Sequence, residues 1–145
     1  MAYELPPILK LSERLLVEIE EAYPGLIRKY RYGFGDGLRQ SALRVALLAK
    51  KTWNDSENRE VRIKQLDDAV EDLKLRITTG GRLRAYSSRG QFENLARNAT
   101  ELGRQIGGWT LKISQHPKGQ NASSRASTQR ASSLSTRATS REVNL

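Results

Sequence analysis

Four carboxylates crowd into one short stretch of the sequence with the spacing that acid–base or metal chemistry would need. They are Asp67, Asp68, Glu71 and Asp72. Residues four apart share a helix face, and paired carboxylates on one face can move protons or hold a metal ion. Lys64, Lys74 and Arg76 flank the group, however, and no histidine lies near it. We therefore interpret these carboxylates as a solvated, ion-paired helix face.

Two other patterns are weaker candidates for chemistry. The run Gly33–Gly37 is rich in glycine, but a phosphate-binding loop follows a strand, and no strand pattern precedes this run. We interpret it as a turn and a helix start, with Asp36 near the cap. His116 is the only histidine and the chain has no cysteine, so the common nucleophile–base pairs are missing. We expect no catalytic residue, no metal site and no cofactor, and hence a protein that is not an enzyme.

Basic residues carry more information, because 25 Lys and Arg against 16 Asp and Glu give a net charge of +9. Arginines interleaved with aromatic residues suit phosphate contact and base stacking. One cluster surrounds Tyr30 and Tyr32, and a second surrounds Tyr86. The expected binding residues for nucleic acid or a protein partner are Arg28, Lys29, Arg31, Arg76, Arg82, Arg84 and Arg89. Two alternatives stay open, namely that these charges are merely solvated or that the basic tail does the binding.

Residues 1–115 must supply the scaffold that positions these clusters. Apolar residues recur at helical spacing in four segments, which start near residues 8, 38, 63 and 95, and no segment alternates as a strand does. This pattern predicts an all-α protein, an antiparallel up-down four-helix bundle. Gly80 and Gly81 would normally end the third helix, but the apolar phase continues, so that helix ends between Ile77 and Tyr86. Trp109 continues the apolar stripe of the last helix and is predicted to be a core anchor.

The remaining 30 residues, 116–145, have a different composition. They are rich in Ser, Thr, Ala and Arg, and they carry too little apolar area to offset the entropy of ordering, so we expect a disordered basic tail. The absence of cysteine fits a reducing compartment. The first residues do not resemble a signal peptide, and no segment has the roughly 18 apolar residues of a membrane span. We therefore expect a cytoplasmic protein without a membrane partner.

Two rows of residues predict that the bundle forms an oligomer. Leu9, Leu16 and Tyr23 form a second apolar row beside the core stripe of the first helix, which is wider than one bundle usually buries. Gly103 and Gly107 form a row of small residues on the last helix, and each glycine costs about 1 kcal/mol relative to alanine. Close approach of another subunit would explain that cost, and packing within one bundle is the alternative.

Parts of the sequence resemble a known family. The runs are Tyr23-Pro24, Arg31–Arg39 (RYGFGDGLR), Gln91–Glu93 and Glu101–Trp109, of which the ending GRQIGGW is the most specific. They are similar to the four-helix-bundle proteins that include the accessory variability determinant (Avd) of diversity-generating retroelements. The same family includes bundle proteins encoded within intervening sequences of ribosomal RNA genes. The resemblance covers about residues 8–115 and leaves out the tail, and the two glycines after Ile77 depart from it.

The resemblance implies a specific function. Avd proteins form barrel-like homopentamers with a basic surface and bind the reverse transcriptase and template RNA of the retroelement, with the cDNA as a further candidate ligand. The complex makes cDNA that is mutated at adenines and diversifies a target gene, and the accessory protein has no catalytic site. We choose Avd over the ribosomal RNA branch because of the basic charge balance. A structural helical oligomer without a nucleic-acid role remains a third hypothesis.

Overall fold

The computed structural model describes residues 6–115, which form four long helices and no strand. The long helices are α1 (Pro7–Ala22), α3 (Asp36–Asn54), α4 (Arg59–Leu83) and α5 (Arg89–Gln115). The predicted all-α bundle is therefore confirmed in this part of the chain. The predicted tail, residues 116–145, lies outside the described residues. None of the described helices is long and apolar enough to span a membrane.

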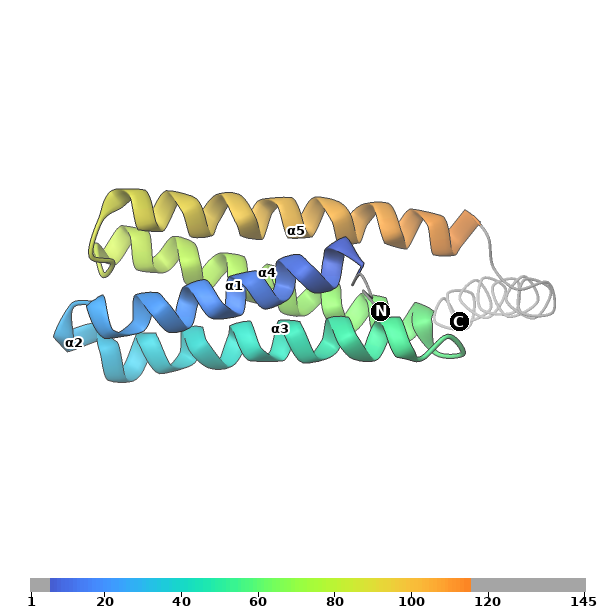
Figure 1. Cartoon of the computed structure of the whole chain (residues 1–145), viewed down its shortest axis with the longest axis horizontal. Helices are drawn as coiled ribbons and strands as arrows, with labels where there is room; N and C mark the ends of the chain where they lie inside the picture. The colour runs from blue at the N-terminus through green and yellow to red at the C-terminus, as the bar shows by residue number, and fades with distance from the viewer. Residues whose placement is uncertain (1–5, 116–145) are drawn as a thin grey trace, which may run out of the picture. The chain divides into compact units, whose positions relative to one another are not determined.

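The helices lie side by side, and the chain turns back at each end of the bundle (Figure 1). Helix α3 packs against both α1 and α4. Helix α5 contacts α1, where the Asn98 amide donates a hydrogen bond of 2.8 Å to Glu18. It contacts α4 as well, since a Cβ on Gly103 would lie 4.0 Å from the Val70 side chain. Each long helix therefore has two neighbours.

The core consists largely of the apolar stripes predicted from the sequence. Leu11 and Leu48 are only half-buried, and so is Trp109, which was predicted to be a core anchor. The predicted stripe residues that the structure buries are Ile8, Leu15, Ile19, Ala22, Leu38, Ala42, Val45, Ala49, Ile63, Leu66, Val70, Leu73, Ile77, Leu95, Ala99, Leu102 and Ile106. The 3.6-residue period thus identified the core, because each helix turns one apolar face toward the bundle axis.

The connection between α1 and α3 is mostly helical. A 3-10 turn, η1 (Tyr23–Gly25), leads to α2 (Arg28–Tyr30), and a π-helical segment, η2 (Arg31–Gly35), then runs directly into α3. The predicted turn is wrong, because Arg31–Gly35 is helical, but α3 does start at Asp36, directly after Gly35 at the N-cap position, as predicted. Within the described residues, Asp36 forms no capping hydrogen bond. Its carboxylate instead accepts a hydrogen bond of 2.7 Å from the Tyr23 hydroxyl. That contact holds the end of α1 against the start of α3.

Helix α4 continues through Gly80 and Gly81. The absence of side chains at these two positions leaves room for aromatic rings. A Cβ on Gly80 would lie 2.5 Å from Phe34 and 2.7 Å from the Tyr86 hydroxyl, and a Cβ on Gly81 would lie 2.6 Å from Phe92. The helix ends at Leu83, and Arg84 adopts the left-handed conformation with φ 56°. The amide of the next residue, Ala85, donates to the Gly80 carbonyl at 3.0 Å. The glycines therefore mark an aromatic packing site and not the end of the helix.

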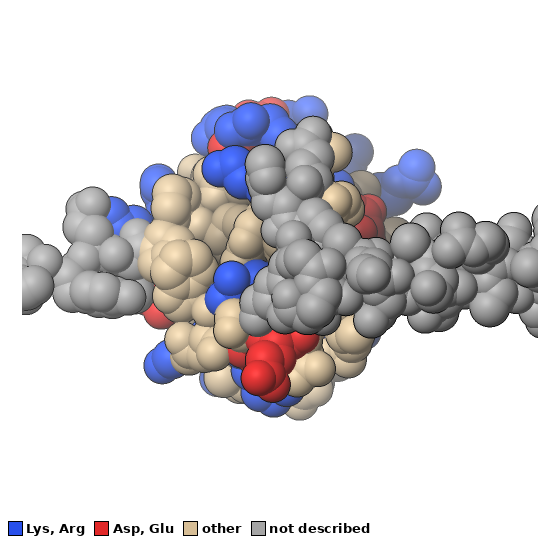
Figure 2. Space-filling model, turned by 90° about the vertical axis from the view of Figure 1, so that its right-hand side faces the viewer, with Lys and Arg blue, Asp and Glu red and all other residues tan. Residues whose placement is uncertain are grey.

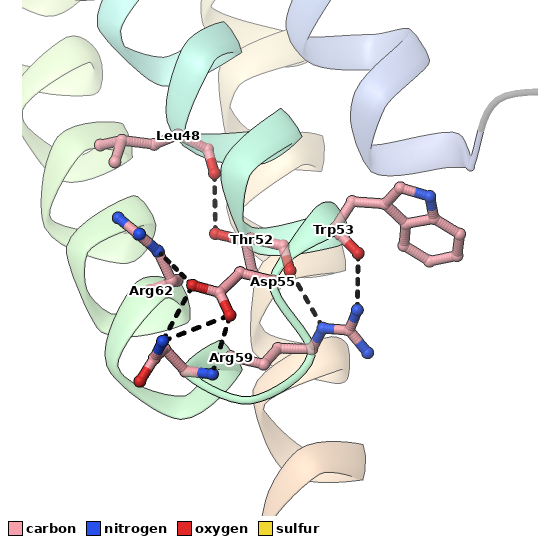
Figure 3. A network of polar contacts seen from close by, with 7 residues as sticks. Leu48, Thr52, Trp53, Asp55, Arg59 and Arg62 are labelled. Carbon is pink, nitrogen blue, oxygen red and sulfur yellow. Dashed lines mark hydrogen bonds and ion pairs between the residues drawn. The ribbon is translucent and has the colours of Figure 1, made fainter.

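A polar network joins α3 to α4 at the other end of the bundle (Figure 3). The Arg59 guanidinium donates to the carbonyls of Thr52 and Trp53, at 3.0 and 2.6 Å, and so caps the end of α3. Asp55 accepts hydrogen bonds from the Asn58 amide and pairs with Arg62 at 3.1 Å. Hydrogen bonds from the Asn58 side chain and backbone, and then from Arg62, hold the pKa of Asp55 below its ordinary value.

Candidate nucleic-acid interface

The structure brings the two basic clusters to the same end of the bundle. The Ile27 amide, just before α2, donates a hydrogen bond of 2.8 Å to the Ala85 carbonyl in the α4–α5 turn. A Cβ on Gly25 would lie 3.4 Å from Ser87 of that turn. Figure 1 shows α2 and the α4–α5 turn at the same end of the bundle. Residues that are more than 50 positions apart in the sequence therefore share one surface.

Three of the predicted binding arginines have charges that no other described residue neutralises. Arg28, Arg82 and Arg84 are exposed, and none of them forms an ion pair or a hydrogen bond within residues 6–115. Arg84 is also the only described residue other than glycine that has a positive φ. Unpaired arginines on a fixed backbone favour an anionic partner, because a phosphate can form the bidentate contacts that the protein leaves open.

The other predicted binding residues are already engaged to different degrees. Arg76 pairs with Asp72 and Arg89 pairs with Glu93, each at 3.0 Å, but both pairs are exposed, and such pairs exchange readily for a ligand. The Lys29 ammonium lies 5.2 Å from the Tyr30 ring centre.

Arg31 differs from the rest of its cluster. Its Nη2 atom donates to the Leu26 carbonyl at 3.1 Å, and its Nε atom is buried without a hydrogen-bond partner among the described residues. The predicted binding role of Arg31 stays a prediction, and its side chain already contacts the connection before α3.

A cavity of about 350 Å³ lies beside the α4–α5 turn. The residues that line it are Gly81, Arg84, Tyr86, Ser87, Ser88, Arg89 and Phe92. The rings of Tyr86 and Phe92 stack with centres 5.7 Å apart and planes 24° apart. The Tyr86 hydroxyl donates to the Ile77 carbonyl at 3.0 Å, and burial raises its pKa. Two predicted arginines thus meet an aromatic pair in one cavity.

The sequence reasoning missed Ser87, Ser88 and Phe92 as members of this site. A signal for the serines was present, because Ser88 precedes α5 and its hydroxyl accepts a hydrogen bond of 3.1 Å from the Gln91 amide, as a helix cap does. Phe92 carried no such signal. Its role depends on the absence of a side chain at Gly81, which only the packing of α4 against α5 reveals.

Two of the four carboxylates between residues 67 and 72 form the predicted ion pairs, and Asp67 and Asp68 are exposed. Glu71 pairs with Lys74 at 3.1 Å, and Asp72 pairs with Arg76 at 3.0 Å. Asp72 also accepts a hydrogen bond of 2.9 Å from Ser41 on α3. Within residues 6–115, no group of three His, Asp or Glu side chains is placed to hold a metal ion. The ion pairs therefore account for Glu71 and Asp72.

The residues predicted for the oligomer interface fall into different environments. Leu9 is 4% exposed and belongs to the core, so its assignment to a second, exposed row is wrong. The half-buried Tyr23 is covered by the Arg39 guanidinium, 4.2 Å from its ring centre. Gly103 packs against α4, whereas a Cβ on Gly107 would have no neighbour within 4 Å. Leu16 is half-buried and remains available at the surface.

An apolar patch that the sequence reasoning missed lies next to Leu16. Leu43 and Leu47 on α3 are 46% and 50% exposed, and a shallow groove of about 500 Å³ between α1 and α3 is lined by Leu16 and Leu43. Arg39 and Glu20, which pair at 3.0 Å, also line this groove. Residues four apart on α3 point the same way, so the two leucines extend one apolar strip.

The opposite end of the bundle has a mixed surface. Figure 2 shows Lys and Arg side chains along the top edge and again at the bottom, where acidic side chains lie beside them, and uncharged residues between the two edges. The rings of Trp53 and Trp109 lie 6.2 Å apart, and the Arg59 guanidinium lies 5.8 and 5.9 Å from their centres. Trp53 is 39% exposed. The predicted core anchor Trp109 is thus half-buried and belongs to a Trp–Arg–Trp group at the surface, because it lies beyond the last fully packed layer at Ile106.

A comparison with protein-family models gives no match for this sequence. A comparison with curated proteins also gives no match.

Proposed function

We propose that this chain is a non-catalytic accessory protein of a diversity-generating retroelement, an Avd protein, which works in the cytoplasm. In this proposal the antiparallel up-down bundle assembles into a basic homopentamer. The assembly binds the reverse transcriptase and the template RNA and so supports mutagenic cDNA synthesis. The observation that supports this best is the meeting of two basic clusters at one end of the bundle, with Arg28, Arg82 and Arg84 unpaired among the described residues.

The direct test measures RNA binding as a function of salt. The double charge reversal Arg82→Glu and Arg84→Glu should weaken RNA binding and flatten its salt dependence between about 50 and about 200 mM salt. The matched control reverses Lys50 and Lys51, which are exposed at the end of α3 and change the net charge by the same amount. Deletion of residues 118–145 should have a smaller effect. The proposal that the basic clusters bind RNA is refuted if the control and the test variants lose the same affinity for RNA. It is also refuted if only the tail deletion abolishes RNA binding.

The role of the reverse transcriptase needs a separate experiment. Some of the exposed arginines would face an acidic surface of the enzyme, and a pull-down without RNA separates this contact from RNA binding. Co-purification of the chain with the products of neighbouring genes should recover a reverse transcriptase. Recovery of ribosomal particles alone would favour the alternative, a bundle protein encoded in a ribosomal RNA intervening sequence.

A second candidate function is a structural helical oligomer without a nucleic-acid role. The exposed Leu43 and Leu47 beside Leu16 favour it, because such an apolar strip buries well against another subunit. Light scattering of the full chain at micromolar concentration should give a pentamer under our proposal. A pentamer that fails to bind RNA at any salt concentration would support the structural alternative, and a monomer would contradict both.

A further inference from the structure

The cavity beside the α4–α5 turn combines a flat apolar floor with a basic rim. Phe92 is half-buried, stacks on the buried Tyr86 and lines the cavity with it. Arg84 and Arg89 line the same cavity from opposite ends of the turn. An aromatic face beside guanidinium groups is the combination that single-stranded nucleic acids use, because bases stack on the ring and phosphates contact the arginines.

The polar groups of the turn still have capacity for a ligand. The Ser88 hydroxyl accepts a hydrogen bond from the Gln91 amide, which leaves its own proton free to be donated. The Ser87 hydroxyl is engaged with the Gln91 side chain at 3.1 Å. Arg89 pairs only with the exposed Glu93, a contact that a phosphate can replace, and Arg84 has no partner among the described residues.

The size of the cavity limits what can enter. A volume of about 350 Å³ lies at the lower end of the range for small-ligand pockets, which suits one nucleotide and not a base pair. A base in a duplex is stacked on both faces, so it reaches such a floor only after it leaves the helix at a cost of a few kcal/mol. A cavity of this kind therefore distinguishes unpaired from paired nucleotides.

We propose that this cavity receives one unpaired nucleotide of a single-stranded RNA, with the base against Phe92 and the phosphate between Arg84 and Arg89. This inference rests on the proposed RNA-binding function and adds a preference to it. The exposed arginines attract any polyanion, whereas the cavity selects strands that have a free base. The bundle thus binds its RNA at a single-stranded segment.

The first test compares an RNA single strand of about 12 nucleotides with a duplex of the same sequence. Phe92→Leu should weaken single-strand binding about 5- to 150-fold, the range expected for the loss of one base stack, and should change duplex binding little. Arg84→Asn removes the charge, and asparagine tolerates the left-handed backbone at this position. This variant should bind both the single strand and the duplex more weakly. Trp53→Leu, which removes an exposed ring at the other end of the bundle, is the matched control and should change neither.

A second measurement on the unaltered protein guards against a folding defect in Phe92→Leu. A single strand that carries 2-aminopurine should change its fluorescence on binding, because the base exchanges its stack on neighbouring bases for the cavity, and Phe92→Leu should reduce the change. The proposal is overturned if fluorescence is unchanged on binding, or if Phe92→Leu weakens single strand and duplex equally. It is also overturned if the variants no longer bind the reverse transcriptase but still bind the RNA, because the cavity would then be a protein contact. Salt-dependent RNA binding that needs Arg82 but ignores strandedness would refute the cavity and leave the proposed function standing.

Discussion

The substitution Gly80→Ala tests the packing at the basic end of the bundle most directly. Helix propensity alone predicts that alanine in the interior of α4 stabilises the protein by about 1 kcal/mol. The structure predicts the opposite sign, because the new Cβ would lie 2.5 Å from Phe34 and 2.7 Å from the Tyr86 hydroxyl. Tyr86 cannot move away cheaply, since it is 8% exposed and its hydroxyl is bonded to the Ile77 carbonyl.

The expected magnitude follows from these opposing effects. Overpacking costs about 1 to 3 kcal/mol, and disruption of the Tyr86 hydrogen bond adds about 1 kcal/mol. The helix gain of about 1 kcal/mol offsets part of this cost. We therefore expect Gly80→Ala to lower the free energy of unfolding by about 1 to 3 kcal/mol. Gly81→Ala should cost less, because the ring that it meets, Phe92, is only half-buried.

Urea unfolding followed by circular dichroism at a fixed protein concentration measures both values. Gly108→Ala is the matched control, because a Cβ there meets nothing within 4 Å and should stabilise α5 by about 0.5 to 1 kcal/mol. If Gly80→Ala stabilises the protein as much as Gly108→Ala does, the aromatic packing on α4 is wrong. Gly107→Ala extends the series, since a loss of stability that depends on concentration would place another subunit at that residue.

Three further substitutions probe other parts of the bundle. Trp109→Ala should lower the free energy of unfolding by about 1 to 3 kcal/mol, instead of the roughly 3 to 5 kcal/mol expected for a fully buried ring. A larger loss in urea unfolding would restore the assignment of Trp109 to the core. Asp55→Asn should lower the urea midpoint near neutral pH. Because the pKa of Asp55 is lowered in the folded state, the difference from the unaltered protein should shrink as pH falls from about 5 to below 3, and a constant difference would contradict the network. Arg84→Gly should raise the melting temperature, because glycine suits the positive φ, and should weaken RNA binding; unchanged RNA affinity would remove Arg84 from the site.

The sequence predicted the bundle well because helical periodicity is a local signal. Residues such as Leu15, Leu66 and Leu102 recur with the period of the helix, and each is fully buried. The errors lie where a contact between distant segments decides the outcome. Gly80 and Gly81 resemble a helix end until the rings of Phe34, Tyr86 and Phe92 are known to need their space.

The sequence predicted which arginines belong to the candidate site, but it did not predict how they are brought together. Charge and residue type identified Arg82, Arg84 and Arg89, since surface arginines beside aromatics are visible in the sequence. The hydrogen bond between Ile27 and Ala85, which brings Arg28 to the same end, joins residues that no local pattern relates. The prediction that Leu9 belongs to an oligomer interface was wrong for a related reason. Neighbouring helices of the same chain can bury an apolar face that is wider than usual.

The glycines, the left-handed arginine and the cavity depend on one another. Without side chains at Gly80 and Gly81, the rings of Tyr86 and Phe92 lie directly on α4, and this draws the first turn of α5 close to the end of α4. The chain must then reverse within a few residues, which it does through the left-handed Arg84. That position favours glycine on backbone grounds, by roughly 1 kcal/mol or more. Arg84 bears this cost as the cap of α4, forms no ion pair among the described residues and lines the cavity next to two aromatic rings, which is the arrangement that the proposed nucleotide contact uses.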